Sequence, residues 1–382
     1  MNRPVLIHVF LVAIALVSAY FVWTRDTTTR EDEVPVLSIR GDLDRVVYSA
    51  PKRNVEIQRK KDNLGPYYWV EVQTEQEKPA PPAPKPDAGT ASAPDAGAPA
   101  KKAGEKPGPA TPTKADAGKP ATPQKPPKPK MITTTKNQAF KGNKSVEELV
   151  KGLAGLSAVR SLGQVDKAKL KAFELEGSKK TLTLVTDSTP RTFIIGGNTF
   201  GNMDVYIQDK QDGRVYVVRP RLLQDLQYAE FRLVDRDLNG FEPADVERAA
   251  LVAGKQRKVL MQKNRRDPAS AFWVDAEAPE KKKDFYRNFM GKLLRLQAME
   301  YVSPAESKKP LTELLSVEFE TAGGKREALK LLQGGGPAIA PPGGKPADKE
   351  FYAISSNTRQ LVKVNPRLAD EVARDVDNLM KD

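Results

Sequence analysis

The sequence predicts an α+β protein in which an N-terminal transmembrane helix precedes two similar modules of short antiparallel sheets with packed helices. Three observations lead to this prediction. The first is a long apolar run close to the N-terminus. The second is a hairpin-like motif that the chain contains twice. The third is a proline-rich stretch that interrupts the first of the two modules.

The apolar run, Pro4–Trp23, has the length of a membrane span. Twenty residues at about 1.5 Å per residue cover the roughly 30 Å of a bilayer core. Tyr20 and Trp23 stand at its far end, where amphipathic rings prefer the membrane interface. A signal peptide cleaved after Ala19 is the alternative. We favour an uncleaved anchor over residues 1–25 because the apolar run continues past that site. The protein is then a single-pass protein of the inner (cytoplasmic) membrane, with the bulk of its chain in the periplasm.

The repeated motif consists of an acidic residue, an apolar residue and tyrosine, followed by a strand-like run and Pro-Arg-Leu. It occupies residues 204–222 and again residues 350–368, and the tyrosines and the prolines of the copies are each 146 residues apart. This pattern predicts a β-hairpin followed by a short helix, in which proline is tolerated in the first turn. The repeat therefore predicts two modules of one architecture, residues 34–76 with 131–228 and residues 240–382.

Runs of β-branched and aromatic residues predict the strands of the first module. They are expected at five places: 46–48, 55–57, 67–72, 181–185 and 192–195. A helix is expected from a cap at Asn143 or Ser145 to about Leu162, because its apolar residues share one face. Strands flank the glycine-rich segment Gly196–Gly201, so we interpret it as a turn rather than a phosphate-binding loop.

The second module repeats these landmarks. Trp69 and Trp273 each lie fourteen residues after a valine in a strand-like run, which favours a core or inter-sheet role for both rings over a ligand-stacking role. One segment, Arg326–Gln333, consists of good helix formers. Its counterpart in the first module is the strand at 192–195, and its leucines alternate with other residues, so we predict a strand there too.

A proline-rich insertion, residues 77–130, divides the first module. From Lys78 to Lys130 it contains 15 prolines, no aromatic residue, and ten lysines against four acidic residues. Such a composition has too little apolar area to offset the entropy of ordering, which predicts disorder. One folded module holds both of its ends, so the stretch is expected to loop out of that module rather than link two domains.

The composition excludes several classes of chemistry. The chain has no cysteine, and its only histidine, His8, lies in the predicted membrane span. Catalytic triads and zinc sites that need either residue are therefore excluded. We identify no catalytic, cofactor-binding or metal-binding residues, and the binding residues remain unassigned. A hydrolase that uses only carboxylates stays open as a third hypothesis.

One acidic segment begins like a calcium loop. Its candidate ligands have the spacing of the first positions of such a loop: Asp235, Asp237, Asn239 and Gly240. The twelfth position requires a bidentate glutamate and is Val246. We therefore interpret the segment as the junction between the modules and expect no metal there.

The net charge of +13 indicates an anionic neighbour, such as nucleic acid, lipid headgroups or an acidic wall polymer. A solvated lysine-rich surface is the alternative. We expect no nucleic acid partner for a chain whose bulk lies outside the cytoplasm.

The repeat unit resembles a known family. The likeness is carried mainly by Arg191–Gly197 and Val215–Val218, with the Asp-Val-Glu-Arg sequence at Asp245, a tryptophan strand and a leucine-rich helix. These motifs are similar to the bacterial domain-of-unknown-function family 4340, of which two copies would cover residues 34–382 without the insertion. The resemblance implies a single-pass membrane protein that accompanies gliding-type ABC transporter subunits. It supplies no functional residues, and the long insertion departs from the family pattern.

The expected function follows from the anchor, the duplicated module and this resemblance. We expect a non-enzymatic binding or scaffold subunit, an accessory component of an ABC-type export or gliding-type membrane complex. Its partners would be the lipid bilayer and membrane protein subunits, and it would need no cofactor. The alternative is an envelope-binding protein whose basic disordered loop grips anionic wall or lipid polymers.

Overall fold

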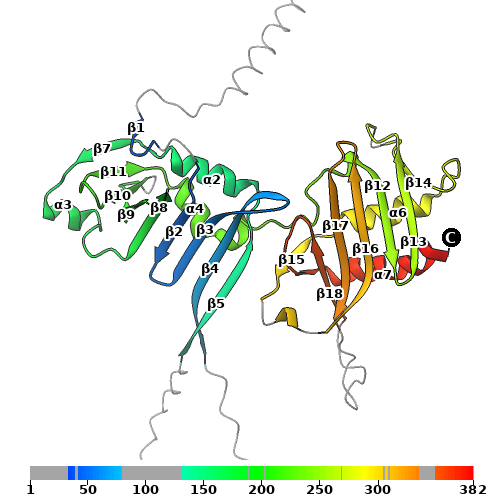
Figure 1. Cartoon of the computed structure of the whole chain (residues 1–382). Coiled ribbons are helices and arrows are strands. Elements are labelled where there is room, and N and C mark those ends of the chain that lie inside the picture. The colour runs from blue at the N-terminus through cyan, green and yellow to red at the C-terminus, as the bar shows by residue number, and fades with distance from the viewer. Residues whose placement is uncertain are drawn as a thin grey trace, which may run out of the picture. The chain divides into compact units, whose positions relative to one another are not determined.

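The computed structural model describes most of the chain outside the predicted anchor and the predicted proline-rich insertion (Figure 1). The described residues are 33–38, 42–79, 131–187, 189–201, 204–267, 269–303, 306–308, 310–334 and 349–381. The predicted anchor at 1–25 lies outside them, as does the predicted insertion from residue 80 onward. Within these ranges, none of the helices combines the length and the apolar character needed to cross a membrane.

The described chain is rich in antiparallel sheet, as predicted. The first sheet has nine strands in the order β5-β4-β3-β2-β8-β9-β10-β11-β7. Its strands are β2 (Arg45–Ala50), β3 (Arg53–Asp62), β4 (Gly65–Pro79), β5 (Met131–Lys141), β7 (Arg160–Gly163), β8 (Lys180–Thr186), β9 (Thr189–Asn198), β10 (Val205–Asp209) and β11 (Val215–Val218). A separate small pair joins β1 (Val34–Pro35) to β6 (Ser157–Ala158).

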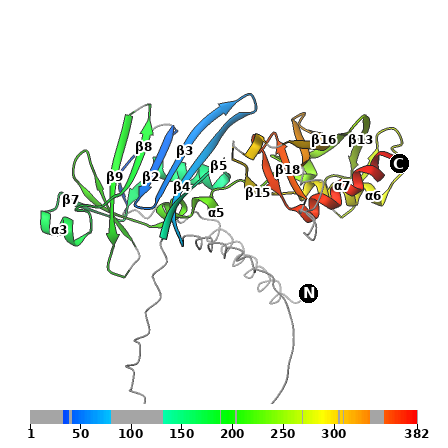
Figure 2. The same ribbon diagram turned by 90° about the horizontal axis from the view of Figure 1, so that it is seen from below.

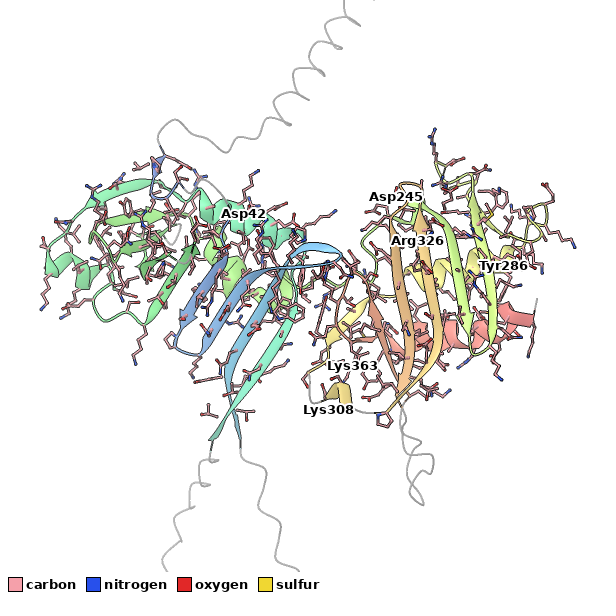
Figure 3. All side chains as sticks on the ribbon, in the orientation of Figure 1. Asp42, Asp245, Tyr286, Lys308, Arg326 and Lys363 are labelled. Atoms are coloured by element: carbon pink, nitrogen blue, oxygen red, sulfur yellow. The ribbon has the colours of Figure 1, made fainter. Side chains whose placement is uncertain are left out.

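The second sheet has eight strands in the order β14-β13-β12-β16-β17-β18-β19-β15. Its strands are β12 (Val246–Ala253), β13 (Gln256–Lys263), β14 (Phe272–Asp275), β15 (Ala298–Tyr301), β16 (Leu311–Thr321), β17 (Arg326–Gly334), β18 (Glu350–Ser355) and β19 (Val362–Val364). Taken in their order across the sheet, these strands correspond one by one to β4, β3, β2, β8, β9, β10, β11 and β7 of the first sheet. The first sheet differs by one further strand, β5, at its edge. Asp42 and Asp245 lie just before the matching strands β2 and β12 (Figure 3).

Helices cover one face of each sheet. The first module contains α2 (Lys144–Ala154), α3 (Lys167–Ala172), α4 (Arg221–Gln227) and α5 (Ala229–Arg232). The second contains α6 (Asp284–Leu294) and α7 (Pro366–Lys381), which lie side by side along its sheet (Figure 2), and the short 3-10 turns Pro243–Asp245 and Glu306–Lys308. Apolar residues of α2 and α4 form one core with the first sheet, and those of α6 and α7 form another with the second.

The helix expected to run from residue 143 to Leu162 is shorter than predicted. Asn143 caps α2 as expected, because its side chain accepts a hydrogen bond from the Ser145 amide at 3.0 Å. The helix ends at Ala154, and Gly155 follows as its C-cap. The chain then enters β6 and β7, so Val159, expected on the apolar face, is exposed. The residues beyond Gly155 pair as strands, β6 with β1 and β7 with β11, so tertiary pairing outweighed their helical periodicity.

The repeated motif forms the predicted hairpin in both modules. Strands β10 and β11 pair in the first copy and β18 and β19 in the second. Their turns share a hydrogen bond: the Gly213 amide donates to the Asp209 carbonyl, and the Arg359 amide donates to the Ser355 carbonyl, both at 3.0 Å. The donor has a positive φ in each case, 72° for glycine and 56° for arginine. The second copy therefore keeps an arginine in a conformation that favours glycine.

The segment Arg326–Gln333 is strand, as the repeat predicted against local propensity. It belongs to β17, which lies between β16 and β18. Glu327, Leu329 and Leu331 are buried, whereas the residues between them are exposed. Tertiary pairing thus determines the conformation of a segment made of helix formers.

The two tryptophans occupy matching pairs in the ladder but opposite environments. Trp69 lies opposite Gln58 and Trp273 opposite Gln262. Trp273 is buried in the core of the second module, as predicted, but Trp69 is only half-buried and packs edge-on against Tyr67 and Tyr301. The preceding hairpins differ in register by one residue, which exchanges the two faces of the strand. The prediction of a core or inter-sheet role is met as a core role by Trp273, whereas Trp69 lies outside the core and packs against Tyr301 of the second sheet.

Substituting two glycines should separate steric packing from chain entropy. Gly196 in β9 has no room for a side chain, since a Cβ there would lie 2.3 Å from the Phe173 carbonyl oxygen. Gly196→Ala should lower the free energy of unfolding by about 1–3 kcal/mol through overpacking. In α6, a Cβ at Gly291 would meet nothing within 4 Å. Gly291→Ala should raise stability by about 0.5–1 kcal/mol. Urea unfolding of both variants tests this, and equal effects at the two sites would contradict the packing account.

Candidate functional site

The acidic segment at the junction is used for ion pairing and hydrogen bonding. Asp235 accepts a hydrogen bond from Lys141 Nζ at 2.5 Å, and Asn357 Nδ2 lies 3.1 Å from the same carboxylate. Its other oxygen accepts from the Asp237 amide. Gly240 donates its amide to the buried Glu327 carboxylate at 2.8 Å. Among the described residues, no group of three or more His, Asp or Glu side chains is placed to hold a metal ion.

A second contact joins the same two modules. Asp62, at the end of β3, accepts a hydrogen bond from Arg359 Nε at 2.5 Å. The Arg359 guanidinium also lies over the Tyr67 ring, 4.3 Å from its centroid. Arg359 is the residue that adopts positive φ where the first hairpin has glycine. The energetic cost of that conformation is offset by the ion pair and the cation–π contact.

The contact of Arg359 should be visible in the titration of its partner. Arg359, with the amides of the turn, holds the pKa of Asp62 below its usual range. Arg359→Gly suits the turn and removes the cation, so the pKa of Asp62 should rise towards its ordinary value. Asp267, whose pKa is lowered by Ser270 and the Ala269 amide, is an internal control that should not change. Carboxyl NMR titration measures both, and an unchanged Asp62 would show that the contact is not formed in solution.

A groove of about 710 Å³ runs between α2 and α4 on the first module. The two helices approach closely at Gly152, because a Cβ there would lie 3.0 Å from Leu222. Both charge signs line the groove, and its lining residues are Ser145, Glu148, Leu149, Lys151, Gly152, Arg221, Leu222, Asp225 and Arg232. Arg232 pairs with Asp225, whereas Lys151 and Arg221 form no ion pair with other described residues. Glu148 in the same lining also forms no ion pair with other described residues, so the groove holds unpaired charges of both signs.

Two aromatic side chains are exposed on the segment that leads into the groove residue Arg232. Tyr228 is 56% exposed and Phe231 is 71% exposed, and Phe231 directly precedes the groove residue Arg232. They lie three residues apart on α5 and its cap, on the side away from the buried Ala229. Large exposed apolar side chains next to polar residues are typical of protein-binding surfaces.

An ion pair fixes the short segment that carries these rings. Arg53 on β3 donates from both terminal nitrogens to the Glu230 carboxylate, each at 2.6 Å. Both side chains are largely buried. Burial alone raises the pKa of Glu230, but the hydrogen bonds and charge of Arg53 outweigh it and hold the pKa below its ordinary value. A bidentate pair of this kind orients α5 against the sheet.

Breaking this pair should destabilise the protein in a pH-dependent way. A lowered carboxyl pKa stabilises the fold above the ordinary pKa of glutamate, and that stabilisation is lost as pH falls through the lowered value. Arg53→Met should therefore reduce the free energy of unfolding at pH 7 by about 1–3 kcal/mol. The loss should shrink at acid pH, where Glu230 of the variant is protonated. Urea unfolding at several pH values measures it. Arg214→Met, which removes an exposed pair with Asp212, is the control and should change little.

The remaining sequence candidates are structural. Gly196 and Gly197 pack against the chain at residues 173–175, and the Gly197 amide donates to the Phe173 carbonyl at 2.8 Å. The groove and the exposed aromatic pair were not predicted. A signal was present: Tyr228 and Phe231 are three residues apart, as the buried Leu226 and Ala229 are, but are offset from them by two positions. The sequence could not indicate that α4 would stop at Gln227 and expose them.

Comparison with known proteins gives one match. No curated protein and no solved structure is similar enough to this chain to register as a relative. Residues 133–313 match the model of the family described as "Domain of unknown function (DUF4340)". The match extends from β5 to the start of β16 and includes Arg191–Val218, which carried the resemblance in the sequence. The predicted family resemblance is therefore confirmed for residues 133–313, which carry the signature of the DUF4340 domain.

Proposed function

We propose that this protein is a membrane-anchored, non-enzymatic binding or scaffold subunit, an accessory component of an ABC-type export or gliding-type complex. In this proposal Pro4–Trp23 anchors it in the inner membrane and the modules lie in the periplasm. The observation that carries the proposal is the exposed aromatic pair Tyr228 and Phe231, on the segment that leads into the groove between α2 and α4.

Physical chemistry favours a protein partner for that surface. Aromatic residues and arginine dominate the binding energy of protein interfaces, particularly where neighbouring polar residues exclude water. The ion pair of Arg53 with Glu230 holds the rings in place before binding, so little conformational entropy is lost on association. A membrane anchor would also raise the local concentration of this surface near membrane subunits, so that weak contacts suffice.

The residue inventory supports a role without catalysis. The chain lacks cysteine, and its one histidine is His8, inside the proposed anchor. The buried carboxylates of the described residues are engaged by cations or amides: Asp209 by Arg191, Asp235 by Lys141 and Glu327 by Lys325. Carboxylates paired in this way stabilise the fold and are poorly placed to exchange protons with a substrate.

The proposal predicts that the aromatic pair is needed for complex formation. Full-length protein with Tyr228→Ser and Phe231→Ser should lose crosslinks to ABC permease or associated membrane subunits by at least about tenfold, as truncation of interface hot spots does. Its melting temperature should stay unchanged, because both rings are exposed. Phe200→Ser removes another fully exposed aromatic, from the β9–β10 turn, and is the matched control. Crosslinking in membranes followed by mass spectrometry measures the yield.

Deleting residues 78–130 distinguishes the alternative. If the protein binds envelope polymers through its basic insertion, the deletion should abolish envelope association. The aromatic double variant should then associate with the envelope as the unaltered protein does. If it is a scaffold, the deletion should leave the crosslinks in place. Unchanged crosslinks in the aromatic double variant would contradict the proposed surface.

A further inference from the structure

Strand β5 forms an open edge of the first sheet. It is the terminal strand in the order and pairs only with β4 along its length. At its C-terminal end the outer side is occupied, because the chain returns there: the Asp235 amide donates to the Lys141 carbonyl, and the Asn143 amide donates to the Leu233 carbonyl. Before Lys141 the outer side has no neighbouring strand among the described residues.

Alternation along the strand identifies the backbone groups that this edge presents. The Gly142 amide donates inward to the Tyr68 carbonyl at 2.8 Å, whereas the Lys141 carbonyl points outward to Asp235. In an antiparallel strand the inward and outward groups alternate by residue. The N–H and C=O groups of Ala139 and Asn137 therefore point outward, as those of Lys141 do, and are available to a further strand.

A cavity of about 590 Å³ lies next to these groups. It combines residues of the first sheet with the segment that follows β15, and its polar lining is dominated by amides and carboxylates. The lining residues are Asn54, Glu56, Glu71, Val72, Gln73, Asn137, Gln138, Ala139, Tyr301, Val302, Ser303 and Gln360. The cavity thus has unpaired edge backbone on one side and hydrogen-bonding side chains around it, which suits a polypeptide more than an apolar small molecule.

Two carboxylates in the cavity lie in one row across the sheet. Glu56 and Glu71 are direct cross-strand partners, an arrangement of like charges that is unfavourable by itself. Arg45 pairs with Glu56 at 2.6 Å and its charge also acts on Glu71, which itself forms no ion pair within 4.0 Å with other described residues. Continuing the register from Gly142 opposite Tyr68 sets Ala139 opposite Glu71. Because Ala139 has a small side chain, Glu71 is not covered on the side that faces the sheet edge.

We propose that an extended, lysine- or arginine-bearing segment of a partner protein binds at this edge as an added strand. Its backbone pairs with the outward groups of Asn137 and Ala139. The residue opposite Ala139 is a cation whose side chain passes over the alanine methyl group to the Glu71 carboxylate. Main-chain pairing supplies affinity in this mode, and the Glu56–Glu71 row supplies the preference for a basic residue. This site goes beyond the proposed scaffold role and uses a different surface from the aromatic pair.

A second copy of this chain fits the edge less well. Pairing β5 with another β5 would require a cation from the same strand in the row of Glu71. The strand holds Lys136 and Lys141. Lys136 is an odd number of residues from Ala139, so its side chain projects from the other face of the sheet. Lys141 is already paired with Asp235 at 2.5 Å. A partner segment with its own basic residue satisfies Glu71, and a second copy does not.

The second module has no equivalent of this edge. Its sheet ends at β14, which has four residues, where the first sheet continues from β4 to β5. The edge of β5 also lacks the usual protection against pairing, since Lys141 and Lys136 are its only charged residues and it contains no proline. The extra strand is therefore a specific feature of the first module.

Peptide binding to the full-length protein tests the proposal. The probes are fluorescent seven-residue peptides of alternating threonine and valine with a central lysine, or with glutamine in its place. The lysine peptide should bind about three- to tenfold more tightly by fluorescence anisotropy, as expected for one charge-assisted contact. Glu71→Gln should remove this preference, and Lys136→Gln, on the other face, should not.

Blocking the edge provides the second arm. Ala139→Pro deletes an outward N–H that makes no bond to β4, a position at which an edge strand tolerates proline. It should abolish binding of both peptides, and peptides N-methylated on their pairing side should fail equally with the unaltered protein. Equal binding of lysine and glutamine peptides, or unchanged binding to Ala139→Pro, would overturn the proposal. A dimer of the unaltered protein that Ala139→Pro dissociates would also overturn it, in favour of a second copy. The aromatic double variant should bind the peptides normally, so the two proposals can fail separately.

Discussion

The structure depends on the burial of one face of each antiparallel sheet under helices. Side chains alternate between the faces of a strand, so the pairing register decides which residues enter the core. In the first module Ile57 and Val70 face α2, and in the second Leu260 and Trp273 face α6. A difference of one residue between the two first hairpins is enough to move Trp69 out of the core. On that outer face it packs edge-on against Tyr301, so a change of register in one strand also creates a contact between the modules.

The parts of the fold that could be predicted from the sequence are those in which the same sequence motif occurs in both modules. The hairpins of β10–β11 and β18–β19 and the strand β17 follow from two copies of one motif, because a match over a whole module outweighs local propensity. The end of α2 and the exposure of Trp69 could not be predicted this way. The first depends on the pairing of β6 and β7 with other strands, and the second on register, which no single strand sequence determines. Long-range contacts were also out of reach: neither Asp62 nor Arg359 has a neighbour in sequence that indicates the other.

Arg359 adopts an unfavourable backbone conformation and makes an ion pair with the other module. At the same turn of the first hairpin, glycine adopts a positive φ without cost, and no partner is required. In the second copy arginine adopts a similar backbone conformation and places its guanidinium between the Asp62 carboxylate and the Tyr67 ring. A local rule is broken where a compensating interaction is made. Together with Lys141, Asp235 and Asn357, this contact adds polar connections to the aromatic one, in which Tyr301 packs against both apolar cores.

The two modules share one strand order but differ in the helix that follows the repeated hairpin. The second ends in α7, a continuous helix of 16 residues with Ala369, Val372, Val376 and Leu379 buried on its sheet. In the first, the corresponding chain breaks into α4 and α5 at Tyr228 and turns towards the junction, which leaves aromatic side chains at the surface. The first module also carries β5, a strand that exists because the chain returns from the insertion. The continuous α7 covers its sheet in the second module, whereas the break between α4 and α5 exposes aromatic side chains in the first. In the two proposals above, both partner sites lie on the first module, while the core pattern of the sheet is retained in both modules.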